Sequence, residues 1–132
     1  MRPENSNDEL VRRMIEEVWN GERPDRLPAF WADPTRAEAE QLHSVLVGAF
    51  PDLRITVEDT VADDEKVAAR MTFRGTHRGS FRGIEPTGRP VEFSSIRIYR
   101  IEDGKVVQTW AEVDALGLLG QLRGSDAGPA GH

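Results

Sequence analysis

The stretch LRITVEDTVADDEKVAARMTFRGTH, residues 53–77, marks the point where the hydrophobic pattern of this chain changes from helical to extended. Apolar and polar residues alternate from position 53 to position 57, which is the period-two pattern of a half-buried strand. The Asp63-Asp64 pair then indicates a turn, and a second alternating run follows it. The stretch therefore predicts two consecutive strands of one antiparallel sheet.

Two more strands follow a glycine-rich connection. Residues 75–90, GTHRGSFRGIEPTGRP, contain four glycines and two prolines, which is too many for a continuous strand. We expect a long hairpin connection in which Phe81 and Ile84 fold back as a lid. Alternation resumes over residues 91–101 and, after a Glu-Asp-Gly turn, over residues 105–113, which predicts the third and fourth strands of a meander.

Helical periodicity lies on both sides of the strands. Before them, capping-box patterns at Ser6 and Thr35 begin two amphipathic helices, which end near Gly21 and before Pro51. After them, a leucine-rich run predicts a short closing helix, and residues 124–132 are expected to form a disordered polar tail.

Helices ahead of a four-strand meander predict an α+β fold in a single domain, residues 1–123. We expect a strongly curved antiparallel sheet, packed against the N-terminal helices, that encloses a conical pocket. The opposite face of such a sheet needs its own cover, and a second subunit usually provides it when that face is apolar.

The composition narrows the class of protein. The chain has 132 residues, and its 23 acidic residues exceed its 17 lysines and arginines, so its net charge of −6 has the wrong sign for a nucleic-acid-binding domain. It has no cysteine, and its three histidines lack metal-binding spacing, so metal-free acid/base chemistry is expected if the protein is an enzyme. No apolar run fits a membrane span and the N-terminus lacks a signal-peptide pattern, which predicts a cytoplasmic protein.

Chemistry-bearing side chains gather on the last predicted strand. Strict alternation puts Gln108, Trp110, Glu112 and Asp114 on one face. If that face lines a cavity, Trp110 forms part of its wall and the carboxylates are candidate acids or bases. The alternative is that both carboxylates are solvated, with Asp114 capping the closing helix.

Candidates on other elements also have two interpretations. Arg97 shares a face with Phe93 and could orient a carboxylate or polarise a substrate oxygen in a pocket, unless the face of Ile96 is the core instead. His77 could point at the same cavity and titrate near neutral pH, or it could be a hydrogen-bonded structural histidine. His43 lies beside the apolar stripe of the second helix, which predicts a surface position.

Four segments of the chain resemble the SnoaL-like polyketide cyclase family, part of the superfamily with the cone-shaped barrel fold of nuclear transport factor 2 and ketosteroid isomerase. They are VRRMIEEVWNGERPDRL (11–27), AFPDLRITVED (49–59), GTHRGSFRGIEPTGRPVEF (75–93) and RIEDGKVVQTWAEVDALGLLGQL (100–122). The G-T-H-x-G-x-F-x-G-I-x-P-T-G run and the closing W-x-x-x-D-x-x-G-L-L-x-Q-L run are the most specific parts.

The resemblance implies a cofactor-free homodimer that closes a ring in a hydrophobic polyketide intermediate of secondary metabolism, by intramolecular aldol condensation. It implies that Asp114 is the general acid/base and that His77 is the histidine of the family motif, and with Arg97 these are the predicted catalytic residues. The predicted substrate-binding residues are Trp110, Gln108, Glu112, Phe93, Phe73, Tyr99 and Trp19.

The chain departs from the family pattern between its first two long helices. Family members usually have a strand there, whereas here only residues 27–34 intervene, so we expect that strand to be deleted or shortened. One wall of the cone would then be missing or supplied by the partner chain. Two other functions therefore stay open: epoxide opening of the limonene epoxide hydrolase type, and ligand binding without catalysis.

Overall fold

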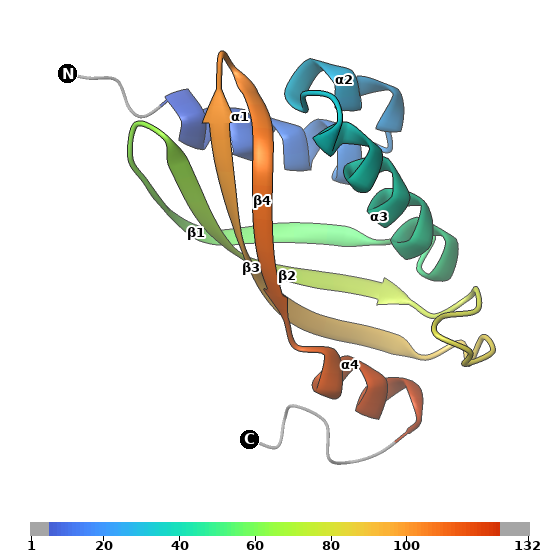
Figure 1. Ribbon diagram of the computed structural model, residues 1–132. Coiled ribbons are helices and arrows are strands. Elements are labelled where there is room, and N and C mark those ends of the chain that lie inside the picture. The colour runs from blue at the N-terminus through green and yellow to red at the C-terminus, as the bar shows by residue number, and fades with distance from the viewer. Residues whose placement is uncertain (1–5, 125–132) are drawn as a thin grey trace.

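The computed structural model describes residues 6–124, in which N-terminal helices pack on one side of a four-stranded sheet (Figure 1). The helices are α1 (Ser6–Met14), the π-helix η1 (Ile15–Asn20), the 3-10 helix η2 (Pro24–Arg26), α2 (Leu27–Phe30), α3 (Thr35–Ala49) and α4 (Ala115–Leu122). The strands are β1 (Arg54–Ala62), β2 (Lys66–Thr76), β3 (Pro90–Glu102) and β4 (Lys105–Val113). None of the helices described in this range is long and apolar enough to cross a membrane. Residues 125–132 of the predicted tail lie outside the described part.

The strands form a meander in the order β1-β2-β3-β4, and every neighbouring pair is antiparallel. The predicted strands, the long connection and the closing helix are thereby confirmed. The expected strongly curved cone is wrong, because the sheet is open and not strongly curled. Since the edge strands β1 and β4 are not paired with each other, the four strands leave the barrel unclosed.

A single bridge stands where the family pattern has a further strand. Trp31 pairs in parallel with Val106 of β4, and the amide of Ala32 donates to the Val106 carbonyl at 2.9 Å. The short helices η2 and α2 occupy the preceding residues. Between η1 and α3 the described residues therefore contain no strand, and this bridge lies along the free edge of β4.

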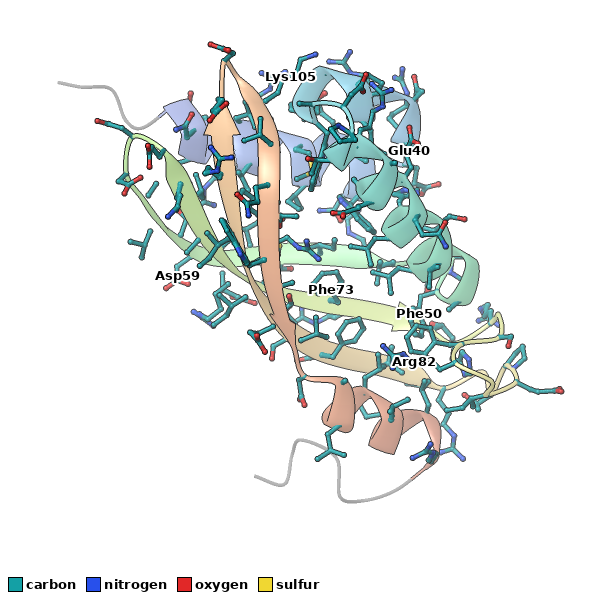
Figure 2. The ribbon with its side chains drawn as sticks, in the orientation of Figure 1. Glu40, Phe50, Asp59, Phe73, Arg82 and Lys105 are labelled. Carbon is teal, nitrogen blue, oxygen red and sulfur yellow. The ribbon has the colours of Figure 1, made fainter. Side chains whose placement is uncertain are left out.

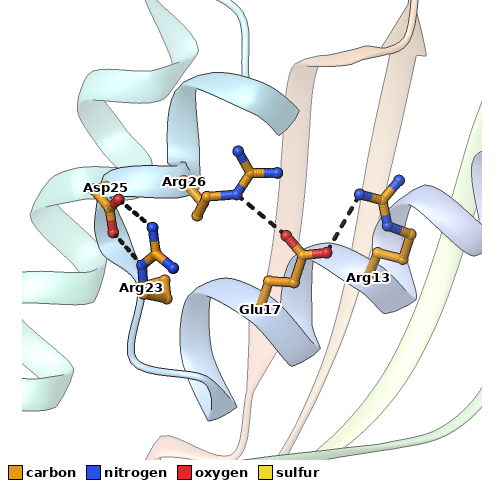
Figure 3. Close-up of polar contacts among 5 residues, drawn as sticks. All are labelled: Arg13, Glu17, Arg23, Asp25 and Arg26. Atoms are coloured by element: carbon orange, nitrogen blue, oxygen red, sulfur yellow. Dashed lines mark hydrogen bonds and ion pairs between the residues drawn. The ribbon is translucent and has the colours of Figure 1, made fainter.

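The short helices are held near α1 and η1 by charged and aromatic contacts (Figure 3). Glu17 accepts hydrogen bonds from Arg13 and from Arg26, both at 3.3 Å. The two guanidinium groups also lie 5.5 and 6.0 Å from the ring centroid of Phe30. Because exposed ion pairs contribute little, the burial of Phe30 and Leu27 accounts for more of this docking.

The core lies between the inner face of the sheet and the helices. Alternate residues of β2 and β3 are buried there, namely Val67, Ala69, Met71 and Phe73 on β2 and Val91, Phe93, Ser95 and Tyr99 on β3. Phe73 lies directly opposite Phe93, and their rings are stacked with centroids 4.9 Å apart. A cross-strand aromatic pair of this kind contributes about 1 kcal/mol beyond simple burial.

A β-bulge at Val107 changes the face toward which the rest of β4 points. Arg100 of β3 pairs with Gln108, whereas the next residue, Ile101, pairs with Val106, so Val107 has no pairing partner on β3. Beyond the bulge the odd-numbered residues of β4 face the helices and the even-numbered ones face away. Strict alternation over the whole strand is therefore wrong. Gln108, Trp110 and Glu112 do share one face, but the bulge puts that face opposite to the buried side chain of Val106.

Thr35 attaches the beginning of α3 to this bulge. Its hydroxyl donates to the carbonyl of Val107 at 2.8 Å. Pro34 is the residue before the helix, and no side chain caps the helix amides, so the predicted capping box at Thr35 is wrong. The contact instead fixes the distance between α3 and the inner face of the sheet.

Candidate functional site

An apolar hollow of about 260 Å³ lies between the inner face of the sheet and the helices α3 and α4. The stacked pair Phe73 and Phe93 forms part of its wall, and leucines of both helices form much of the rest. Val113 at the end of β4 also contributes, because the bulge turns it toward the helices. A mostly apolar hollow with few polar groups is typical of a small-molecule site.

A second hollow of about 230 Å³, which we call the polar hollow, adjoins the first and shares Leu42 and Arg97 with it. Glu38 of α3, Tyr99 of β3 and Thr109 of β4 are among its other lining residues. Burial raises the pKa of Tyr99 to about 12, against the opposing charge of Arg97. The Tyr99 hydroxyl therefore stays protonated at neutral pH and can donate a hydrogen bond.

Arg97 stands at the junction of the two hollows. Its side chain lies on the inner face with Phe93, whereas Ile96 and Ile98 are exposed on the outer face, so the alternative in which the Ile96 face is the core is wrong. The Nη1 atom of Arg97 donates to Oγ1 of Thr109 at 3.0 Å. No carboxylate within residues 6–124 forms an ion pair with this guanidinium, which keeps donors for a ligand.

The connection between β2 and β3 covers one end of the apolar hollow. Phe81 and Ile84 exchange two backbone hydrogen bonds, at 3.0 and 2.8 Å, and Arg82 and Gly83 between them have positive φ, as in a type I′ turn. The turn buries Phe81 against Phe50, with 5.5 Å between ring centroids. Figure 2 shows Phe50 beside this connection and Arg82 within it. The predicted folding back of this segment is confirmed.

The same connection is fastened to the end of α3. The amides of Arg78 and Gly79 both donate to the carbonyl of Ala49, at 2.9 and 3.1 Å. A Cβ atom on Gly79 would lie 2.0 Å from the carbonyl oxygen of Gly48. Only glycine permits this close approach of two backbones.

His77 lies beneath the connection and lines neither hollow. Its Nδ1 accepts a hydrogen bond from the amide of Thr87 at 3.2 Å and lies 3.0 Å from the Thr87 hydroxyl. The acceptor role of Nδ1 places the ring proton on Nε2, which has no hydrogen-bond partner among the described residues. Of the two interpretations given for His77, this geometry fits the hydrogen-bonded structural histidine.

Asp114 lies at the edge of the apolar hollow without lining it. Its carboxylate is exposed and accepts a hydrogen bond from the amide of Gly117 at 2.9 Å, so it caps α4. Val113 and Ala115, on either side of it, do line the hollow. Of the three predicted catalytic residues, only Arg97 lines the hollow.

Between residues 6 and 124 there is no cluster of three His, Cys, Asp or Glu side chains that could hold a metal ion.

Three of the predicted substrate-binding residues lie on the outer face of the sheet. Trp110 is 44% exposed there, and Gln108 and Glu112 are exposed on the same face. The ammonium group of Lys66 lies 5.8 Å from the Trp110 ring centroid. Their predicted position inside a pocket is wrong, because the bulge at Val107 reverses the face of the strand.

The other predicted substrate-binding residues are on the inner face. Phe93 and Phe73 line the apolar hollow, while Tyr99 and Trp19 line the polar one. His43 is also on this side: it is buried against Trp19, with 4.8 Å between ring centroids, so its predicted surface position is wrong. Burial lowers the pKa of His43, opposed by a hydrogen bond with the backbone of Val18.

Two residues of the polar hollow escaped sequence analysis. Trp31 is only 5% exposed, and its Nε1 has no hydrogen-bond partner in the described part of the chain. Among the described residues, Glu38 is the only one with a carboxylate in the lining of either hollow. Trp31 comes from the segment 27–34, where the family pattern is interrupted, so no motif indicated it. Glu38 is the last residue of the capping-box pattern that begins at Thr35, and that pattern predicted a helix start and no ligand site.

The sequence model of a family described as SnoaL-like polyketide cyclase matches residues 9–122. No curated protein sequence matches the chain.

Several solved structures have the same fold. AclR from Streptomyces galilaeus, described as a proposed hydroxylase, is 28% identical, with a TM-score of 0.82 over 92% of this chain and 83% of its own. TsrD from Streptomyces laurentii is 31% identical, with a TM-score of 0.74 over 89% of this chain and 94% of its own. A SnoaL-like polyketide cyclase from Agrobacterium tumefaciens is 25% identical, with a TM-score of 0.76 over 90% of this chain and 98% of its own.

Proposed function

Because the chain belongs to the SnoaL-like polyketide cyclase family, we propose that it closes a ring in a hydrophobic polyketide intermediate by cofactor-free acid/base catalysis. The observation that carries this proposal is the apolar hollow, whose lining includes both the stacked aromatic rings and Arg97, a guanidinium that forms no ion pair with a carboxylate within residues 6–124. The aromatic and aliphatic wall suits the carbon skeleton of such a substrate, and the guanidinium suits one of its oxygens.

An aldol closure needs three events that these groups can support. A base removes a proton from a carbon between two carbonyls, the enolate carbon attacks a second carbonyl carbon, and the resulting alkoxide takes up a proton. We assign the enolate oxygen to Arg97, where one well-placed donor in a site shielded from water contributes about 3 kcal/mol to transition-state stabilisation. The wall of Phe73 and Phe93 holds the chain folded, so the reacting carbons meet without a large loss of entropy.

We assign the proton transfer to Asp114. Its neighbours Val113 and Ala115 line the apolar hollow, which places the backbone of Asp114 at the edge of the site. The resemblance of the closing motif to the family supports the same assignment. We give His77 a positioning role, since its contacts with Thr87 hold the connection that carries Phe81 over the hollow.

The test is a ring-closure assay with linear poly-β-ketone intermediates, with the products followed by mass spectrometry. We expect a cyclic isomer of the substrate, or its dehydration product. Asp114→Asn should lower the rate by about 100-fold, while the outer-face control Glu112→Gln should leave it unchanged. A rate for Asp114→Asn within about threefold of the native rate would remove Asp114 from the mechanism. Conversion of limonene epoxide to a diol, with no ring closure of the polyketides, would favour epoxide opening instead.

We also propose that a second copy of the chain covers the outer face of the sheet. Ile96, Ile98 and Trp110 are exposed there side by side on β3 and β4, around a shallow groove of about 410 Å³. Isologous pairing of two such faces would remove these side chains from water. Sedimentation equilibrium should give twice the chain mass, and Ile98→Lys should give the single chain mass. A monomeric native protein at micromolar concentration would contradict the proposal.

A further inference from the structure

The charge in the apolar hollow is unbalanced. Arg97 and Arg82 are the only charged residues in its lining, and no ion pair within residues 6–124 includes either of them. The polar hollow adds one carboxylate, Glu38, which is exposed on α3 and forms no ion pair with Arg97. The whole chain has a net charge of −6, so an all-cationic lining runs against its overall composition.

The surroundings of Arg97 use only part of its hydrogen-bonding capacity. The side chain is partly buried in a lining that includes Phe93 and Leu42, and it donates to the neutral hydroxyl of Thr109. A guanidinium has five N–H donors arranged as a fork that fits two oxygens of one planar anion. Because a charge in apolar surroundings is costly without a partner, an anion bound here would gain more than it would at an exposed arginine.

We infer that the apolar hollow binds its ligand as an organic oxyanion, with an apolar ring system against Phe73 and Phe93 and a carboxylate or enolate paired with Arg97. This inference rests on the proposed function, because it specifies the charge that the same substrate carries when it is bound. Arg82, which is exposed on the turn between Phe81 and Ile84, adds a weaker long-range attraction for the anion.

The far side of Arg97 supports the same conclusion. Tyr99 and Thr109 line the polar hollow beside the guanidinium, and both carry hydroxyl groups that can donate to an oxygen. Burial raises the pKa of Tyr99 to about 12, so its hydroxyl remains a donor over the whole neutral pH range. The groups around the junction of the hollows therefore supply donors for an oxygen-rich anion.

The first experiment uses the native protein and two probes of the same shape. Calorimetric titration compares 2-naphthoate, which is an anion at neutral pH, with 2-naphthamide, which is neutral. We expect 2-naphthoate to bind about tenfold more tightly, as a charge-assisted fork-to-carboxylate contact should give. Equal affinities would exclude a carboxylate as the bound anion, and this comparison needs no variant to fold.

The second experiment assigns the preference to one arginine. Arg97→Gln should reduce 2-naphthoate binding by about tenfold and leave 2-naphthamide binding within about threefold. The matched control is Arg54→Gln, an exposed arginine of β1 outside both hollows, which should change neither affinity. Arg82→Gln should weaken 2-naphthoate binding by at most about threefold, and this effect should disappear in concentrated salt. A preference for the anion that survives Arg97→Gln would overturn the assignment.

A third probe distinguishes the two kinds of oxyanion. The bicyclic 1,3-diketone 2-acetyl-1-tetralone absorbs at longer wavelength as an enolate than as an enol, so binding that stabilises the enolate raises its enolate fraction at fixed pH. A rise with the native protein but not with Arg97→Gln assigns the site to enolates, and tight 2-naphthoate binding without such a rise assigns it to carboxylates.

The anion inference and the proposed ring closure would be contradicted by different results. Binding of 2-naphthamide as tight as that of 2-naphthoate, with no rise in enolate, overturns the anion inference and the assignment of the enolate oxygen to Arg97, while ring closure itself is still tested by the product assay. Absence of binding by all three probes overturns both.

Discussion

Gly79→Ala tests whether the connection between β2 and β3 depends on its close contact with α3. The Cβ atom of an alanine would lie 2.0 Å from the carbonyl oxygen of Gly48 and 3.0 Å from its carbonyl carbon. Both are backbone atoms of a helix, so they cannot move aside as the end of a flexible side chain could. The connection itself must therefore move away from α3.

The size of the effect follows from the contacts that this movement breaks. The amides of Arg78 and Gly79 would lose their shared acceptor, the carbonyl of Ala49, at about 1 kcal/mol for each hydrogen bond. Phe81 would lose part of its burial, and full burial of a phenylalanine contributes about 1.5–3 kcal/mol. We therefore expect Gly79→Ala to lower the free energy of unfolding by about 2–4 kcal/mol.

The assay is urea denaturation followed by tryptophan fluorescence and by circular dichroism. The matched control is Gly48→Ala, on the other side of the same contact, because a Cβ atom there would meet nothing within 4 Å. In a helix this control should be stabilising by about 0.5–1 kcal/mol. Gly79→Ala should also weaken 2-naphthamide binding, since Phe81 covers the apolar hollow. A Gly79→Ala protein within about 0.5 kcal/mol of the native stability would refute the reasoning.

Substitutions at three further residues test other parts of the structure by the same denaturation assay. Thr35→Val removes the donor to the Val107 carbonyl and should lower the free energy of unfolding by about 1–2 kcal/mol; an unchanged urea midpoint would contradict that role. Asp114→Ala removes the acceptor for the Gly117 amide and should lower it by about 1 kcal/mol, whereas Asp114→Asn should retain most of the cap; equal losses would contradict capping. Burial lowers the pKa of His43, so below about pH 6.5 the unfolded chain binds a proton that the folded chain does not, and stability falls with acidification. His43→Phe should lose less stability than the native protein between pH 7 and pH 5, and identical losses would exclude this contribution.

Much of the fold follows from local patterns in the sequence. The change from helical to alternating periodicity near Leu53 marks the beginning of the sheet, and turn residues separate its strands. The glycines and prolines of residues 75–90 indicate a connection, and Phe81 within it is apolar enough to be drawn back to the core. These features depend on residues close together in the chain, so a single sequence is sufficient to predict them.

The orientation of β4 could not be predicted in this way. Its bulge is a property of the pairing between β3 and β4, and Val107 is an ordinary strand residue whose side chain gives no sign of it. One unpaired residue was enough to move Trp110 and Glu112 from the expected pocket to the outer face. The position of His43 was missed for a related reason, because Trp19 of another helix covers it.

The bulge also explains how one strand serves two different surfaces. Beyond Val107, Thr109 and Val113 point inward, where one binds Arg97 and the other lines the apolar hollow. The intervening Trp110 points outward, into the face that we propose for subunit contact. With an unbroken alternation the indole would point inward and the hydroxyl partner of Arg97 outward. The single unpaired residue therefore sets both the chemistry of the hollow and the apolar character of the outer face, so a change in that register would alter ligand binding and assembly together.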